Sequence, residues 1–78
     1  MLLSELEVGK SGVIKSMNQL NEQFRNRLMD IGIYSDAKIV LINTMAFGKM
    51  FIVEVDDVEI CIRRSDAERI ELLWDFYF

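Results

Sequence analysis

The stretch FIVEVDDVEICIR, residues 51–63, decides how the rest of the chain is interpreted. Apolar side chains occupy every second position of residues 51–55, and a second alternating run, 58–62, follows after Asp56 and Asp57. A period of two places the apolar side chains of each run on one face of a strand. A connection of two residues is the length of a tight hairpin turn. The stretch therefore predicts a β-hairpin with one buried face.

A helix is predicted upstream of this hairpin, over about residues 19–31. Four apolar residues there lie three or four positions apart, so they share one face, which we expect to contribute to the core. These residues are Leu20, Phe24, Leu28 and Ile31. Asn18 or Asn21 can cap the start, because a short amide side chain accepts hydrogen bonds from the free NH groups of the first turn. Gly32 stands where a left-handed residue ends a helix, and Ile33 can pack back onto the last turn.

Further strands are expected over residues 13–17, over residues 37–43 and from Ile70 onward. Residues 39–42 are apolar on both faces of their strand. We expect such a strand to be covered on both sides, with the helix as one candidate cover.

A short helical turn near residues 65–69 completes the predicted fold, because Ser65 and Glu68 have the spacing of a capping box. The sum is a mainly β chain of about five short strands with one inserted helix. A sheet this small must curl to bury its face, which predicts a small β-barrel. A chain of 78 residues is expected to form a single domain, residues 1–78.

The composition argues against an enzyme. The chain has no histidine and one cysteine. Without histidine there is no Ser-His-Asp or Cys-His pair, and no histidine-containing site for zinc or iron. A lone cysteine also excludes an internal disulfide, which indicates a reducing compartment.

The charge disfavours nucleic acid as a partner. The formal net charge is −4, and the whole acidic excess lies in residues 40–78. Affinity for nucleic acid rests largely on cationic side chains that replace counterions on the phosphates. Arg63 and Arg64 are the place where a local basic patch could still form.

The sequence predicts a cytoplasmic protein without direct membrane insertion. Its start lacks the positive segment and long apolar run of an export signal. The longest uninterrupted aliphatic run is residues 39–42. A helix that crosses a bilayer needs a much longer apolar segment, of about 20 residues.

Several short blocks, in this order and spacing, resemble the FeoA family over residues 2 to about 72. The blocks are Leu3-x-x-Leu6-x-x-Gly9, Gly12-x-Ile14, Arg27 to Ile33, Ala46-Phe47-Gly48, Ile60-x-Ile62-Arg63 and Ala67-x-x-Ile70. The resemblance implies an SH3-like β-barrel with an inserted helix. It also implies a small accessory protein of bacterial ferrous iron uptake that acts on FeoB, a membrane permease with a cytosolic GTP-binding domain. Similar domains end metal-dependent repressors of the diphtheria-toxin-repressor type.

Two turns depart from that family's pattern. Where the family usually has a Pro-Gly-type turn after the helix, this chain has Tyr34, Ser35 and Asp36. Where a glycine is common in the hairpin turn, it has Asp56 and Asp57. The shapes of both turns are therefore open at this point.

Two segments are candidates for partner binding. Arg27, Met29 and Asp30 could form a docking surface near the end of the helix; alternatively, Arg27 merely sits near the helix's negative end. Phe47, on a loop, is either a hot spot for a protein partner or a plug that folds back into one end of the barrel.

A metal site has weaker candidates: Glu54, Asp56, Asp57, Glu59 and Cys61. Carboxylate oxygens hold hard cations, but a useful site needs about six converging ligands or several waters. Acidic turns are mostly solvated, and Cys61 is better explained as a small apolar residue. We therefore predict no resident cofactor, with weak divalent metal binding as the alternative.

The C-terminus is the richest aromatic segment. Four of the eight aromatic residues lie among the last five positions. Strand alternation would put Trp74, Phe76 and Phe78 on one side. Such an aromatic patch favours an interface with a partner or with a second copy, and the alternative is that the rings cover the open end of the barrel.

These observations lead to one principal hypothesis, a non-enzymatic SH3-like module that binds the cytosolic part of FeoB and regulates iron transport. The alternative is a divalent transition-metal-binding or metal-sensing regulatory domain, as at the end of those repressors. Single-stranded nucleic-acid binding is a third possibility, which the net charge disfavours.

Overall fold

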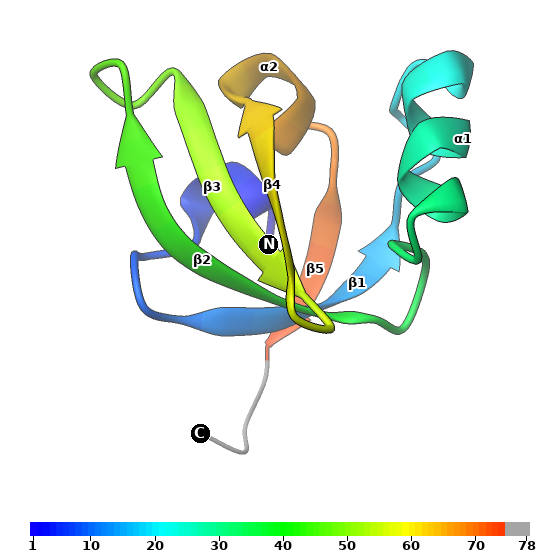
Figure 1. The fold of residues 1–78 in the computed structure, drawn as a ribbon, viewed down its shortest axis with the longest axis horizontal. Helices are drawn as coiled ribbons and strands as arrows, with labels where there is room; N and C mark the ends of the chain where they lie inside the picture. Colours follow the sequence, from blue (N-terminus) through cyan, green and yellow to red (C-terminus); the bar gives the residue numbers. More distant parts are fainter. Residues whose placement is uncertain (75–78) are drawn as a thin grey trace.

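A computed structural model describes residues 1–74, with Trp74 described for its backbone only. Five strands form one antiparallel sheet in the order β4-β3-β2-β1-β5 (Figure 1). The strands are β1 (Ser11–Ser16), β2 (Lys38–Met45), β3 (Met50–Val55), β4 (Val58–Arg63) and β5 (Glu71–Trp74). The helices are the 3-10 turn η1 (Leu3–Glu5), α1 (Glu22–Asp30) and α2 (Arg64–Ala67). The predicted fold class, a mainly β domain with one real helix, is confirmed.

The strands curl as a small barrel requires, but the described strands form an open sheet. β4 and β5 are its two edges, and α2 connects them. The N-terminus runs along the β5 edge, where Leu2 bridges Glu71 and the Leu72 NH donates to the Met1 carbonyl. Backbone hydrogen bonds with the N-terminus therefore replace those that a closed barrel would form at this edge.

The hairpin predicted from residues 51–63 is confirmed. β3 and β4 pair from Met50–Arg63 to Val55–Val58, so Asp56 and Asp57 alone form the connection. The φ angle is 50° at Asp56 and 66° at Asp57. Both are positive, as a type I′ turn requires at its two central residues. This turn twists in the same sense as the strands it joins, which is why two residues suffice.

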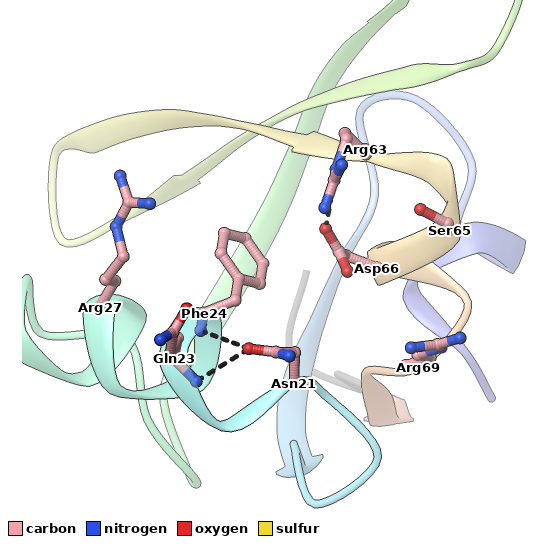
Figure 2. A pocket seen from close by; sticks show the side chains of 8 residues that line it. All are labelled: Asn21, Gln23, Phe24, Arg27, Arg63, Ser65, Asp66 and Arg69. Atoms are coloured by element: carbon pink, nitrogen blue, oxygen red, sulfur yellow. Dashed lines mark hydrogen bonds and ion pairs between the residues drawn. The ribbon is translucent and has the colours of Figure 1, made fainter.

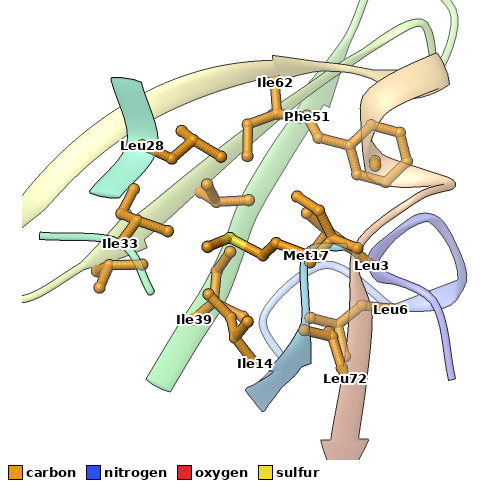
Figure 3. Packing of buried hydrophobic residues seen from close by; sticks show 14 of the residues in the cluster. Leu3, Leu6, Ile14, Met17, Leu28, Ile33, Ile39, Phe51, Ile62 and Leu72 are labelled. Atoms are coloured by element: carbon orange, nitrogen blue, oxygen red, sulfur yellow. The ribbon is translucent and has the colours of Figure 1, made fainter. Parts of the chain in front are cut away.

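The core lies inside the curled sheet (Figure 3). Phe51, Val53 and Val55 of β3 are all buried on one face, as their alternation predicts. Leu3 of η1 and Leu28 of α1 add to the same cluster. One continuous cluster therefore ties both ends of the sheet and the helix together.

Helix α1 is shorter than predicted and begins at Glu22. Asn21 caps it, because its Oδ1 accepts hydrogen bonds from the NH groups of Gln23 (2.9 Å) and Phe24 (3.4 Å). Leu20 precedes the cap and is buried in the turn that leads into the helix. An apolar residue can thus continue a helical spacing from outside the helix, which is why the predicted start is too early.

The end of α1 confirms the role of Gly32. With φ at 92°, its NH donates to Met29 O (3.1 Å), and the Ile33 NH donates to Leu28 O (2.8 Å). This pair of bonds is the Schellman motif. Because the chain reverses here, Ile33 takes the core position, whereas Ile31 is 49% exposed. The prediction that Ile31 belongs to the core was wrong.

Two other expectations also need correction. Ile39 and Leu41 of β2 are buried, but Ile42 on the other face is 39% exposed. The helix does not cover that second face, since α1 stands at one side of the sheet (Figure 1). The capping box is wrong as well: Arg63 is the N-cap of α2, without a side-chain bond, and Ser65 lies inside the helix. β4 leads directly into α2, which leaves no room for a capping residue at position 65.

The turn after α1 keeps the geometry that a glycine would favour. Asp36 has a φ of 75°, and the Ala37 NH donates to Tyr34 O (3.1 Å). The Asp36 NH also donates to Ile14 O (2.7 Å), which fastens the turn to β1. An aspartate tolerates this left-handed conformation better than most residues do.

Candidate functional site: partner-binding surfaces

The turn between β2 and β3 holds an aromatic side chain out in solvent. Met45 and Met50 are the last paired residues, and the Gly48 NH donates to Met45 O (3.1 Å). The connection has four residues, and its first two, Ala46 and Phe47, have φ angles of 53° and 58°. Positive φ angles favour glycine, so both side chains occupy an unfavourable backbone conformation.

Phe47 is fully exposed, at 104% of its reference area. The alternative that it plugs the barrel is therefore wrong. The turn is held from the side by Arg64 at the start of α2, whose Nη1 donates to Gly48 O (3.2 Å). A large apolar ring held in solvent by a strained, braced turn is the arrangement expected of a protein-binding hot spot.

The three candidate residues at the end of α1 are exposed but do not form one surface. Met29 lines a hollow with Met17 and Tyr34. Arg27 lines a groove on the other side of the helix, facing β4 and α2. Positions two apart on a helix point in different directions, so the turn of the helix separates the side chains of Met29 and Arg27.

The groove beside Arg27 is lined by four charged side chains. Its volume is about 430 Å³, and it lies between the first half of α1 and the junction of β4 with α2 (Figure 2). It is lined by Asn21, Gln23, Phe24, Arg27, Arg63, Ser65, Asp66 and Arg69.

Asp66 is the one buried charged side chain found at this groove. Its side chain is 8% exposed, and its Oδ2 lies 3.2 Å from Arg63 Nε. The sequence indicated a possible basic patch around Arg63 and Arg64, but gave no sign of Asp66 and Arg69. Adjacent residues at the strand–helix junction diverge: Arg63 faces the groove and Arg64 braces the Phe47 turn.

The metal candidates are not gathered into a site. Glu54 and Glu59 are cross-strand partners, and Asp56 and Asp57 form the exposed turn beyond them. Cys61 is exposed and pairs with Ile52. Within residues 1–74, no group of three or more Cys, Asp or Glu residues is arranged to hold a metal ion.

The aromatic C-terminus is only partly described. The backbone of Trp74 pairs with Gly12, so the predicted last strand is present as far as Trp74. The Trp74 side chain, Phe76 and Phe78 lie outside the described residues, and their role stays a prediction. Among the helices that the structure describes, none has the length and apolarity needed to cross a membrane.

The chain matches the model of the FeoA domain over residues 1–72. It belongs to the FeoA family. The FeoA protein of Chlorobium tepidum is similar in sequence and structure, with 30% identity and a TM-score of 0.90 over 95% of this chain and 70% of that one. No curated protein shows a significant sequence match.

Two further structures set this FeoA-family fold in context. A Stenotrophomonas maltophilia FeoA complexed with zinc, an SH3 domain protein, is 25% identical, with a TM-score of 0.76 over 92% of this chain and 88% of that one. A manganese-dependent transcriptional repressor has a TM-score of 0.82 at 19% identity over 95% of this chain. This chain spans only 41% of the repressor, so the likeness concerns the fold of one part of it. The predicted SH3-like fold is thus confirmed.

Proposed function

We propose that this FeoA-family protein is a non-enzymatic accessory module of bacterial ferrous iron uptake. It acts in the cytoplasm by docking on the cytosolic part of a FeoB-type permease. Family membership supports the iron-transport role, and the S. maltophilia FeoA has itself been considered a ferrous iron transport activating factor. The observation that carries the docking is Phe47, a fully exposed ring on a turn braced by Arg64.

The backbone conformation at Ala46 and Phe47 is unfavourable, which is consistent with a binding role for the Phe47 ring. A left-handed conformation costs a non-glycine residue roughly 1–2 kcal/mol. Ala46 and Phe47 adopt it in succession, and within the free protein the ring gains no burial in return. A partner could supply that gain, because an aromatic side chain that fills a partner's pocket contributes about 2 kcal/mol or more.

Calorimetric titration of the purified FeoB cytosolic region into the wild-type protein tests the docking. We expect binding, and we expect Phe47→Ser to weaken it about 30-fold, which corresponds to ~2 kcal/mol. Val8→Ser is the control, since it removes an exposed apolar side chain from the turn before β1, outside the candidate docking surfaces. Failure of the folded wild type to bind would refute the proposal.

The remaining candidates can be separated in the same titration. Arg27→Ala tests the α1 groove, and Met29→Ala and Asp30→Ala test the other exposed positions at the helix end. A chain that ends at residue 74 removes Phe76 and Phe78 while it retains β5. Sedimentation of that chain against the full one tests self-association through the tail: equal masses at every concentration would exclude it.

A further inference from the structure

The groove between α1 and α2 carries positive charge on an acidic protein. Three guanidinium groups line it, those of Arg27, Arg63 and Arg69. One carboxylate, Asp66, lies among them. The groove is therefore net positive by two charges, although the whole chain carries −4.

Two of these charges have no counterion within the described part of the chain. Among residues 1–74, the guanidinium groups of Arg27 and Arg69 make no ion pair or hydrogen bond. Asp66 neutralises Arg63 through Nε only, and the Arg63 side chain stays 71% exposed. Acidic residues are numerous in this chain, so leaving these cations unpaired and converging on one hollow requires a reason.

The rest of the lining suits an extended peptide. The Phe24 ring lies between Arg27 at one end and the Arg63–Asp66 pair at the other (Figure 2). The exposed side-chain amide of Gln23 lies beside it and can hydrogen-bond to a peptide backbone. The volume of the hollow is about 430 Å³. Such a volume accommodates several side chains of an extended segment.

We propose that this groove binds an acidic peptide segment of a partner protein, with Arg27 and Arg69 each pairing one carboxylate. The planar guanidinium matches a carboxylate with two parallel hydrogen bonds. Asp66 positions Arg63 and keeps a negative charge inside the groove. The Asp66 carboxylate repels a phosphate backbone, where negative charges are closely spaced, more strongly than it repels a peptide whose carboxylates lie further apart. The assignment does not depend on Phe47 or on FeoB as the partner.

Nuclear magnetic resonance titration of the ¹⁵N-labelled full chain tests the proposal. The probe is a short capped peptide of glutamate and aspartate, and its glutamine and asparagine counterpart is the neutral control. We expect the acidic peptide alone to shift the amides of Gln23, Phe24, Asp66 and Arg69, and to bind more weakly as salt is added. Shifts of equal size with the neutral peptide would overturn the assignment.

Charge-removing variants distinguish binding in the groove from general electrostatic attraction between the protein and the acidic peptide. Arg27→Gln combined with Arg69→Gln is expected to weaken peptide binding about tenfold. Arg25→Gln combined with Lys49→Gln is the matched control: it also removes two positive charges, but neither residue lines the groove, so we expect less than about a twofold change. Equal weakening by this control pair would overturn the proposal. Both altered groove side chains are exposed, so the thermal midpoint should stay at the wild-type value.

Other occupants give distinguishable results. Inorganic phosphate or an oligothymidine that binds this groove more tightly than the acidic peptide would reassign it to phosphates. Shifts of the same amides on raising the protein concentration alone would assign it to a second copy of this chain. Either result would overturn the proposal of an acidic partner segment.

Discussion

Replacing Phe47 with glycine is expected to stabilise the free protein while it weakens docking. The ring is fully exposed, so its removal costs no packing. Phe47 has a φ of 58°. This conformation costs a non-glycine residue roughly 1–2 kcal/mol and costs glycine almost nothing. Glycine makes the unfolded chain more flexible, which offsets roughly 0.5–1 kcal/mol of that relief. The free energy of unfolding should therefore rise by about 0.5–1 kcal/mol.

Thermal unfolding followed by circular dichroism measures this gain. For a domain of this size, about 1 kcal/mol corresponds to about 4–8 °C, so the midpoint should rise by about 2–8 °C. In the FeoB titration, the same variant should lose about 30-fold in affinity or more, because the hot-spot ring is gone. Stability and docking should thus change in opposite directions.

Ala46→Gly is the matched control for this experiment. It relieves the same backbone conformation, at a φ of 53°, but keeps the ring. We expect it to raise the midpoint by a similar amount and to retain docking. A lower midpoint for Phe47→Gly would refute the reasoning, because it would show that the ring packs on the protein. Equal loss of docking in both variants would show that the partner recognises the backbone conformation of the turn and not the Phe47 ring.

Three further predictions concern the sheet and the hairpin. A Cβ added at Gly12 would lie 3.0 Å from Leu73 O. Gly12→Ala should therefore lower the free energy of unfolding in urea by about 1–3 kcal/mol, and an unchanged midpoint would contradict this packing. Asp57 has a φ of 66°, which favours glycine. Asp57→Gly should raise the free energy of unfolding by about 0.5–1 kcal/mol, and a loss of stability would argue against the type I′ turn. Calorimetry with Fe(II), Mn(II) or Zn(II) under reducing conditions should detect binding no tighter than about millimolar, because the candidate ligands lie apart. Tighter binding that Cys61→Ser removes would reveal a site that the separated candidates do not predict.

The hairpin and the helix could be predicted from sequence because each depends on local rules. Alternation in residues 51–63 fixes which side chains face the core, and two residues between the runs fix the turn. Gly32 could be placed for the same reason, since only the backbone next to it determines the left-handed cap. The start of α1 and the capping box at Ser65 were local errors, whereas the errors about burial arose where a residue's environment depends on distant segments. Ile31 and Ile42 are apolar, but whether they are buried depends on where α1 stands.

The docking candidates show the same division. From the sequence, the Phe47 side chain could either fill one end of the barrel or lie exposed in solvent, because an apolar residue in a loop is compatible with both. The turn geometry and the brace from Arg64 decide between them. Arg69 and Asp66 gave no signal in sequence, since a groove lined from α1, β4 and α2 exists only when these elements are brought together.

By itself, the sequence determined the type and order of the main helix and strands, the curled β architecture and the absence of histidine chemistry. These follow from residue period, turn length and composition, which are properties of neighbouring positions. Tertiary structure alone decided that the Phe47 ring stays in solvent and that Arg27 faces Arg63 and Arg69 across a groove. The physical reason is that exposure and charge convergence are relations between segments distant in the chain, and only packing fixes those relations.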